Sequence, residues 1–247
     1  MVAKQQLCAA SVVVRALSIV LLGSFAGACG GSSPPASSAA QPATGAPGTS
    51  QAPSTPRPEY AAADAAYYRA RAGALATESM DEVARTDFWR LRRGRLYVPD
   101  ASNIQELEER LAEAARSESA AGVVDASAAL LATDQADINA HTLRGNALRK
   151  TDHVAEADFH RAVAQGLIDS IVHAGNGQTS DSAWTVYRVE EEYEVLKAKH
   201  ARFISQSRIA VGNRSFDLLD AEQDDGGKLH VYFDVTELMA EQARAPH

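Results

Sequence analysis

Cys29 is the residue whose position points most directly to a chemical modification. It ends an apolar segment, residues 16–28, and opens a stretch rich in Pro, Ser, Ala and Gly. The positive charges of Lys4 and Arg15 precede that segment, and charge, apolar core and small residues in this order predict an export signal. Because Cys8 falls within the signal, Cys29 would be the one cysteine of the mature chain, so no disulfide is expected.

The residues before Cys29 resemble the lipobox of bacterial lipoprotein signals, in which Gly or Ala precedes a cysteine that becomes acylated. In this interpretation residues 1–28 are a lipoprotein signal peptide, and the lipid on Cys29 anchors the chain to a membrane. Gly30 at the next position favours the outer membrane facing the periplasm, with the inner membrane or the cell surface as alternatives. An uncleaved membrane anchor stays open, although the apolar run is shorter than the roughly 20 residues that span a bilayer. A secretory signal that leaves a free cysteine also stays open.

A second set of candidate residues lies in a Gly-rich loop and in the acidic segment that follows it. Backbone N–H groups of such a loop can bind an anion, and carboxylates can act as acids or bases. Both segments also suit structural roles, because Gly ends helices and acidic residues stabilise a helix N-terminus. We favour the structural interpretation. The candidate binding residues are Gly175, Asn176, Gly177, Glu191, Glu192 and Tyr193.

No catalytic set is predicted elsewhere in the chain. Four histidines fall in its middle: His141, His153, His160 and His173. Their spacing matches no zinc motif, and the serines near residue 180 lack a nucleophile elbow. We therefore expect no enzymatic activity, no metal and no cofactor. The basic segment 90–95 is expected to pair with the acidic helix over 106–113, or else to meet an anionic partner.

The elements that must position these residues begin with a helical region, residues 59–173. Helical periodicity predicts helices over about 59–76, 87–97, 120–133, 137–150 and 154–173, and one more that Asn103 caps. In the helix expected over 154–173, the apolar residues recur every four places. Gly145, Ala157 and Ala164 resemble the small-residue spacing of a tetratricopeptide-like helix pair, so antiparallel helical hairpins are expected.

Residues 174–247 predict a small α+β region. A strand is expected over 185–189, a helix over 190–200, and further strands near 209–211, 215–221 and 229–235. Asp225-Gly226-Gly227 predicts a hairpin turn before the last strand, and Thr236 a final helix. The fold class is therefore α+β, with helical hairpins followed by a small antiparallel sheet and one or two helices.

Several motifs in this part of the chain resemble one bacterial family. The Gly175-x-Gly177-x-Thr179 loop, the Ala183-Trp184 pair and Glu191-Glu192-Tyr193 match its pattern, as do DFWRLR upstream and FDLL and VYFDV downstream. From about Asp87 to Val235 the chain is similar to the family catalogued as domain of unknown function 4919. The family has no assigned activity, so the resemblance implies no mechanism.

Residues 29–58, which contain seven of the nine prolines, predict a disordered linker behind the lipidated cysteine. The formal net charge of −8 argues against nucleic-acid binding. Together these features predict a lipid-anchored protein of the bacterial cell envelope, with a non-catalytic domain that binds another envelope protein. An envelope enzyme, or a module that binds lipid or glycan through the Gly175–Glu192 region, is the alternative.

Overall fold

The structure, a computed structural model, describes residues 57–244. The predicted signal peptide, Cys29 and the linker up to residue 56 lie outside these residues. Helices precede a four-stranded sheet, so the predicted α+β fold is confirmed. Within the described range, no helix combines the length and the apolar character needed to cross a membrane.

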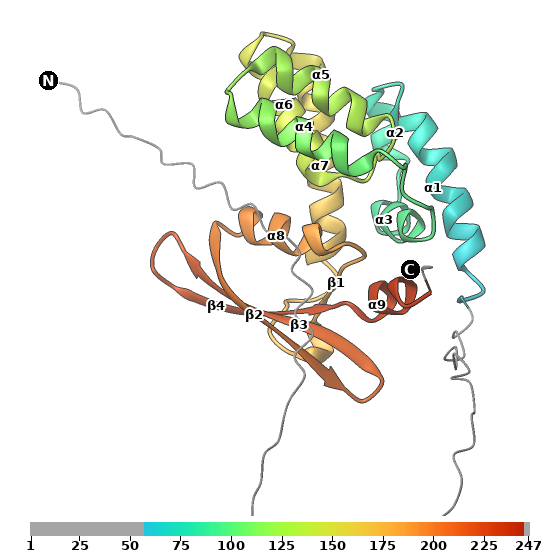
Figure 1. The fold of residues 1–247 in the computed structure, drawn as a ribbon, viewed down its shortest axis with the longest axis vertical. Helices are drawn as coiled ribbons and strands as arrows, with labels where there is room; N and C mark the ends of the chain where they lie inside the picture. The colour runs from blue at the N-terminus through green and yellow to red at the C-terminus, as the bar shows by residue number, and fades with distance from the viewer. Residues whose placement is uncertain (1–56, 245–247) are drawn as a thin grey trace, which may run out of the picture. The chain divides into compact units, whose positions relative to one another are not determined.

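The helical region holds the elements that the periodicity predicts. They are α1 (Ala61–Leu75), α2 (Met80–Ala84), α3 (Phe88–Leu96), α4 (Ile104–Arg116), α5 (Ala120–Leu131), α6 (Ile138–Lys150) and α7 (Val154–Val172). Only α2 was not predicted, because its five residues are too few to show a period and none of them is buried. The helices α4 to α7 each pack against the next one along the chain, as helical hairpins do (Figure 1).

Helix α7 packs closely against α6 and also contributes to the core that reaches the sheet. A Cβ atom at Gly145 would lie 3.2 Å from the carbonyl oxygen of Ala157, so a larger residue would push the helices apart. On the other side of α7, the predicted apolar stripe is buried, with Val163 and Leu167 fully inaccessible. The core cluster that contains this stripe continues to Trp184 and Phe233 in the sheet. Helix α7 therefore joins the two regions through one hydrophobic core.

The sheet contains β1 (Trp184–Thr185), β2 (Ala201–Val211), β3 (Arg214–Gln223) and β4 (Lys228–Asp234), in the order β1-β4-β3-β2. The pairs β2–β3 and β3–β4 are antiparallel, as predicted. The short strand β1 differs, because it pairs with β4 in parallel. A parallel pair needs a long crossover connection, and α8 (Val189–Ala198) with the β2–β3 hairpin supplies it. A 3-10 turn, η1 (Ser180–Ser182), precedes β1, and α9 (Thr236–Gln242) follows β4.

Three local predictions need correction. The strand expected over 185–189 ends after Thr185, because the backbone N–H of Tyr187 turns away to the carboxylate of Glu191. Strand β2 is far longer than the short signal near residue 209, since most of its side chains are exposed and carry no apolar pattern. Asn103 precedes α4 but makes no side-chain capping bond. The hairpin turn is where it was predicted: the N–H of Gln223 donates to the carbonyl of Gly227 at 2.8 Å.

Candidate functional site

The Gly-rich loop before β1 is fastened to the sheet by its own backbone. The indole Nε1 of Trp184 donates to the carbonyl of Gly175 at 3.0 Å. The carbonyl of Gly177 accepts from the N–H of Tyr232 on β4, and its N–H donates to the carbonyl of Ser182, both at 2.8 Å. Gly177 has φ +70°, and a Cβ there would lie 2.9 Å from the Trp184 ring. Glycine is therefore required by conformation and by contact.

Asn176 completes this internal network. Its Oδ1 atom accepts hydrogen bonds from the N–H of Gln178 at 3.0 Å and from the hydroxyl of Ser182 at 2.6 Å. The N–H groups of Gly177, Gln178 and Thr179, which could have bound an anion, are thus engaged within the loop. The arrangement serves to hold the chain between α7 and β1.

Glu191 points in another direction, toward the helical region. Its carboxylate accepts two hydrogen bonds from the guanidinium of Arg92, at 2.8 Å and 2.7 Å, and a third from the backbone N–H of Tyr187. Arg92 also donates to the carbonyl of Thr185 at 2.9 Å, and its side chain is completely buried. The Arg92–Glu191 pair therefore links α3 to α8 and to the end of β1.

Glu192 and Tyr193 face the sheet instead. Glu192 is fully buried beside Asp217 of β3, and burial, followed by the charge of Asp217, raises the pKa of Glu192 to about 9. The ring of Tyr193 packs edge-on against Phe203 of β2, and its hydroxyl donates to the side chain of Gln206. The structure thus brings together Gly175, Asn176 and Gly177. It sends Glu191 toward α3, and Glu192 and Tyr193 toward the sheet.

The basic segment of α3 finds partners other than the acidic helix over 106–113. Arg90 and Arg93 both bind Asp64 of α1, and Arg95 reaches Asp134 at 3.0 Å. The predicted pairing was wrong because α3 packs against α1 and α7, which leaves the acidic face of α4 directed elsewhere.

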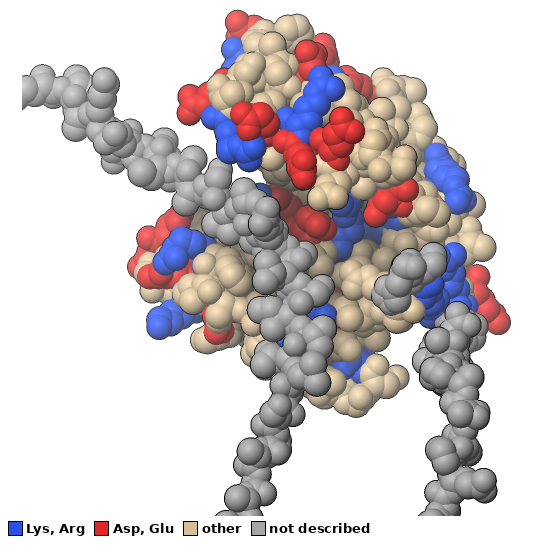
Figure 2. All heavy atoms as spheres, in the orientation of Figure 1, with Lys and Arg blue, Asp and Glu red and all other residues tan. Residues whose placement is uncertain are grey.

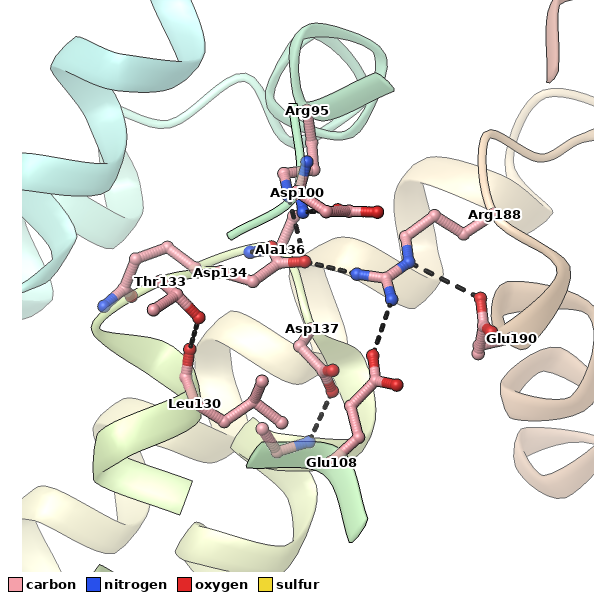
Figure 3. A network of polar contacts seen from close by, with 12 residues as sticks. Arg95, Asp100, Glu108, Leu130, Thr133, Asp134, Ala136, Asp137, Arg188 and Glu190 are labelled. Carbon is pink, nitrogen blue, oxygen red and sulfur yellow. Dashed lines mark hydrogen bonds and ion pairs between the residues drawn. The ribbon is translucent and has the colours of Figure 1, made fainter. Parts of the chain in front are cut away.

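A network of charged residues lies where the helical region meets α8 (Figure 3). Its centre is Arg188, the residue before α8, whose guanidinium forms an ion pair with Asp134 and reaches Glu108 at 3.0 Å. The Nε atom of Arg188 also lies 3.5 Å from Glu190. Asp134 is fully buried. It forms a second ion pair with Arg95 and accepts a hydrogen bond from the backbone N–H of Ala136 at 2.9 Å.

Burial sets the protonation behaviour of this network. It would lower the pKa of Arg188, but the carboxylates around the guanidinium, Asp134 first, raise it further than burial lowers it. Asp137 caps α6 by accepting from the N–H of Ala140 at 2.7 Å. Burial is the main cause that raises the pKa of Asp137 to about 7, despite the opposing charge of Arg188. Burial likewise raises the pKa of Glu108.

A groove runs from this network along the line where α6 faces α8. Its first part is a hollow of about 190 Å³ that Glu108, Asp137, Arg188 and Glu190 border, with Leu111, Leu130 and Ile138 lining it. Its second part is a hollow of about 300 Å³ that Asn146, Arg161 and Lys197 border, with Ala164 and Ile168 lining it. Ile138 and Glu194 line both hollows, so the two parts are adjacent. We call the combined feature the α6–α8 groove.

The chemistry of the groove suits binding. Apolar side chains line it and charged groups border it, which is the usual composition of a ligand or peptide site. Figure 2 shows red and blue side chains gathered in the hollow between the helices and the sheet. Among residues 57–244, no group of three or more His, Cys, Asp or Glu side chains converges as metal ligands would.

Sequence patterns did not point to the groove. Arg188 is 54 residues from Asp134 and 80 from Glu108, so no local spacing connects them. Asp137 was the one accessible signal, because the helix predicted from about residue 137 needs a capping residue at its start.

Comparison with known proteins adds one finding. The model of a domain of unknown function (DUF4919) matches residues 95–244. The chain belongs to the DUF4919 family. The DUF4919 match begins near the end of α3 and includes every residue named above in the α6–α8 groove, whereas α1, α2 and Arg92 precede it. No curated protein and no solved structure matches the chain.

Proposed function

We propose that this DUF4919 protein is a lipid-anchored protein of the bacterial cell envelope that binds another protein, without catalysis, through the α6–α8 groove. The observation that carries the proposal is the groove itself, in which charged side chains border an apolar lining. Buried charges in such a place are held by specific partners, and here Asp134 and Arg95 fix the position of Arg188. A border residue that is held in this way favours binding, because little freedom of the Arg188 side chain remains to be lost.

The sequence before the described residues supports the membrane anchor. Cys29 follows a charged and apolar segment with the order of an export signal, and the lipobox resemblance supports the proposal that its sulfur carries a lipid. The Pro-rich residues 30–56, which lie outside the described residues, would then connect this anchor to the domain. With the anchor in the outer membrane, the domain would face the periplasm and reach partners away from the membrane surface.

The helical hairpins support a role in protein binding. Helices α4 to α7 pack in chain order, and the contact of Gly145 with the backbone of Ala157 resembles the close helix approach of tetratricopeptide pairs. Stacked hairpins present extended concave surfaces that proteins use to hold peptide segments. The alternative, an enzyme or a lipid- or glycan-binding module at Gly175–Glu192, has less support, because the polar groups of that loop bond to one another.

Lipidation is tested by growing cells with an alkyne analogue of palmitate and isolating the chain. The wild type is expected to carry the label and to remain with membranes, and Cys29→Ser is expected to lose both. Cys8→Ser is the matched control and is expected to keep both. Equal labelling of the wild type and Cys29→Ser would refute the anchor.

Binding is tested with a photo-crosslinking amino acid at Asn139, which lines the groove, and at Ser207, an exposed residue of β2. In intact envelopes, the Asn139 position is expected to give one discrete adduct with another protein, and the Ser207 position is not. Arg188→Glu is expected to remove that adduct. Monomer alone at Asn139, or the same adduct from both positions, would contradict the proposed function.

A further inference from the structure

The two ends of the α6–α8 groove carry opposite charge. At one end Glu108, Asp137 and Glu190 border a hollow in which Arg188 is the one basic lining residue. Arg188 pairs with the buried Asp134 and, at 3.0 Å, with one oxygen of Glu108, so it offsets only part of the negative charge at this end. The side chain of Glu108 is 37% exposed and that of Glu190 is 67% exposed, so carboxylate oxygens remain open to a ligand. This end attracts a cation.

The other end attracts an anion. Arg161 of α7 is 59% exposed, and its guanidinium lies 3.8 Å from Asp158, too far for a hydrogen bond. Lys197 of α8 is 62% exposed and pairs with Glu194, whose side chain is 11% exposed. Asn146 of α6 adds an amide to the same hollow. The fork of Arg161 is therefore available to bind a carboxylate in bidentate geometry.

Between these ends the lining is mainly apolar, and the one carboxylate there, that of Glu194, is 11% exposed and paired with Lys197. Ile138 lies where the two hollows meet, and Ala164 and Ile168 of α7 continue the surface toward Arg161. Small or aliphatic side chains suit such a lining, because each apolar group buried there is removed from water. A ligand that is charged along its whole length would leave charges unpaired in the middle.

The distance between the ends fits a short extended peptide. Asp137 caps α6 and Asn146 lies near the end of that helix. A helix rises about 1.5 Å per residue, which places the two ends of the groove about 14 Å apart. An extended chain rises about 3.3 Å per residue and covers that distance in about four residues.

We infer that the α6–α8 groove binds an extended segment of a partner protein with a basic and an acidic residue about four positions apart and small or aliphatic residues between them. The basic residue binds at Glu108 and Glu190, and the acidic residue binds at Arg161 and Lys197. This inference rests on the proposed function, and it names the chemistry of the partner. A free polyamine would bind at the acidic end alone, so its binding would not depend on Arg161.

The probe is a pool of fluorescein-labelled peptides with the pattern Lys-x-x-x-Glu, in which x is Ala, Val, Ser or Thr. Binding to the full chain, solubilised in detergent, is followed by fluorescence anisotropy. Pools in which Lys or Glu is replaced by Gln are expected to bind about tenfold more weakly, the effect of one lost charge-assisted contact. Glu108→Gln is expected to abolish the advantage of Lys, and Arg161→Gln that of Glu.

Each variant has a matched control outside the groove: one on the same helix as Glu108, and one on the helix that precedes that of Arg161. Glu113→Gln on α4 and Arg149→Gln on α6 remove exposed charges and are expected to leave binding unchanged. No binding by any pool would overturn the inference. So would binding of the Lys-x-x-x-Gln pool as tight as that of the bipolar pool, which is the result for a simple cation pocket.

The crosslink at Asn139 distinguishes a failure of the bipolar chemistry from a failure of the proposed function. An adduct that persists in Glu108→Gln and in Arg161→Gln leaves the groove as a protein-binding site but overturns the bipolar chemistry. Absence of any adduct in the wild type contradicts the proposed function itself. An adduct that both variants weaken, with Glu113→Gln and Arg149→Gln unaffected, supports both.

Discussion

The helical region and the α+β region each bury a pair of titratable side chains, but the two pairs are built in opposite ways. In the helical region His141 of α6 and His160 of α7 approach at 2.9 Å between their Nδ1 atoms. Arg144 donates to Nε2 of His160 at 2.7 Å. Nδ1–H of His160 therefore donates to His141, whose Nε2–H faces the carbonyl of Gln135 at 3.3 Å. Both rings are neutral, and each has its donor and acceptor satisfied.

The pair in the α+β region shares one charge. Asp217 of β3 accepts two hydrogen bonds from Arg208, at 2.7 Å and 2.8 Å, and one from Gln206 at 2.8 Å. Glu192 lies beside it. Its Oε1 atom is buried and has no hydrogen-bond partner among the described residues. A second buried negative charge next to Asp217 is unfavourable, so Glu192 remains protonated.

The difference gives the two regions opposite responses to pH. Burial lowers the pKa of His141 to about 3 and that of His160 to about 4, so acid works against the helical region. Burial raises the pKa of Glu192 to about 9, so base works against the α+β region. Because Arg92 and Glu191 join the regions, we expect both effects in one cooperative unfolding transition.

The largest expected effect comes from breaking the link between the regions. Glu191→Ala leaves the guanidinium of Arg92 buried without a counter-charge and the N–H of Tyr187 without its acceptor. Removing one partner of a buried ion pair costs about 3–5 kcal/mol of unfolding free energy. Urea denaturation followed by circular dichroism measures the loss.

Glu190→Ala, one residue earlier on α8, is the matched control. Its side chain is 67% exposed and lies 3.5 Å from Arg188, so the loss is expected to stay below about 1 kcal/mol. Equal losses in the two variants would show that the Arg92–Glu191 pair does not hold the regions together.

The next largest effect is a gain of stability from Glu192→Gln. The pKa of Glu192 is 4.5 ordinarily and about 9 in the folded chain, so the folded state binds an extra proton between these values. Stability is therefore lost as pH rises through this window, by about 1.4 kcal/mol per pH unit. The amide does not titrate and can still donate to Asp217, so a gain of about 3 kcal/mol is expected at pH 7. Urea midpoints at pH 5, 7 and 9 should diverge steadily from wild type, and a constant difference would contradict the shared charge.

A smaller change in stability is expected in acid, where His160 becomes protonated. The pKa of His160 is 6.5 ordinarily and about 4 in the folded chain, so the unfolded state binds more protons in that window. Stability is complete above pH 6.5 and is lost as pH falls toward 4, by about 2 kcal/mol from this ring at pH 5. His160→Gln can still accept from Arg144 but does not titrate. Its stability should decline less between pH 7.5 and 5 than that of wild type, and parallel curves would refute the assignment.

Features that depend on contacts between near neighbours in the sequence were predicted, whereas those that depend on distant contacts were not. The stripe of α7, the alternation of β4 and the Asp225–Gly227 turn were predictable, because each depends on neighbours within a few residues. The Arg92–Glu191 pair spans 99 residues, and nothing in either segment specifies the other. The exposed strand β2 also lacked a pattern, since β3 holds it through backbone bonds rather than through buried side chains.

The candidate site shows why such predictions fail for polar residues in particular. Gly175, Asn176 and Gly177 were recognised as a group because a tight turn constrains them together, and they do form one. The acidic residues of α8 were expected to serve the helix N-terminus. Two of them, Glu191 and Glu192, are instead buried against partners in α3 and β3. A carboxylate carries no sequence mark of the partner that makes its burial possible.

The smallest effect concerns the helix ends of the helical region. Ser119 accepts from the N–H of Gly122 at 3.0 Å, so Ser119→Ala is expected to cost about 1 kcal/mol, the usual contribution of such a cap. Asn103 occupies the same position before α4 but makes no capping bond, so Asn103→Ala is expected to cost less than about 0.5 kcal/mol. Thermal unfolding of the two variants tests whether geometry or residue type decides the contribution. Equal losses would mean that Asn103 caps α4 in solution, and the sequence expectation would then hold for that helix. A loss in Ser119→Ala alone would show that even a strictly local signal depends on how the preceding segment approaches the helix.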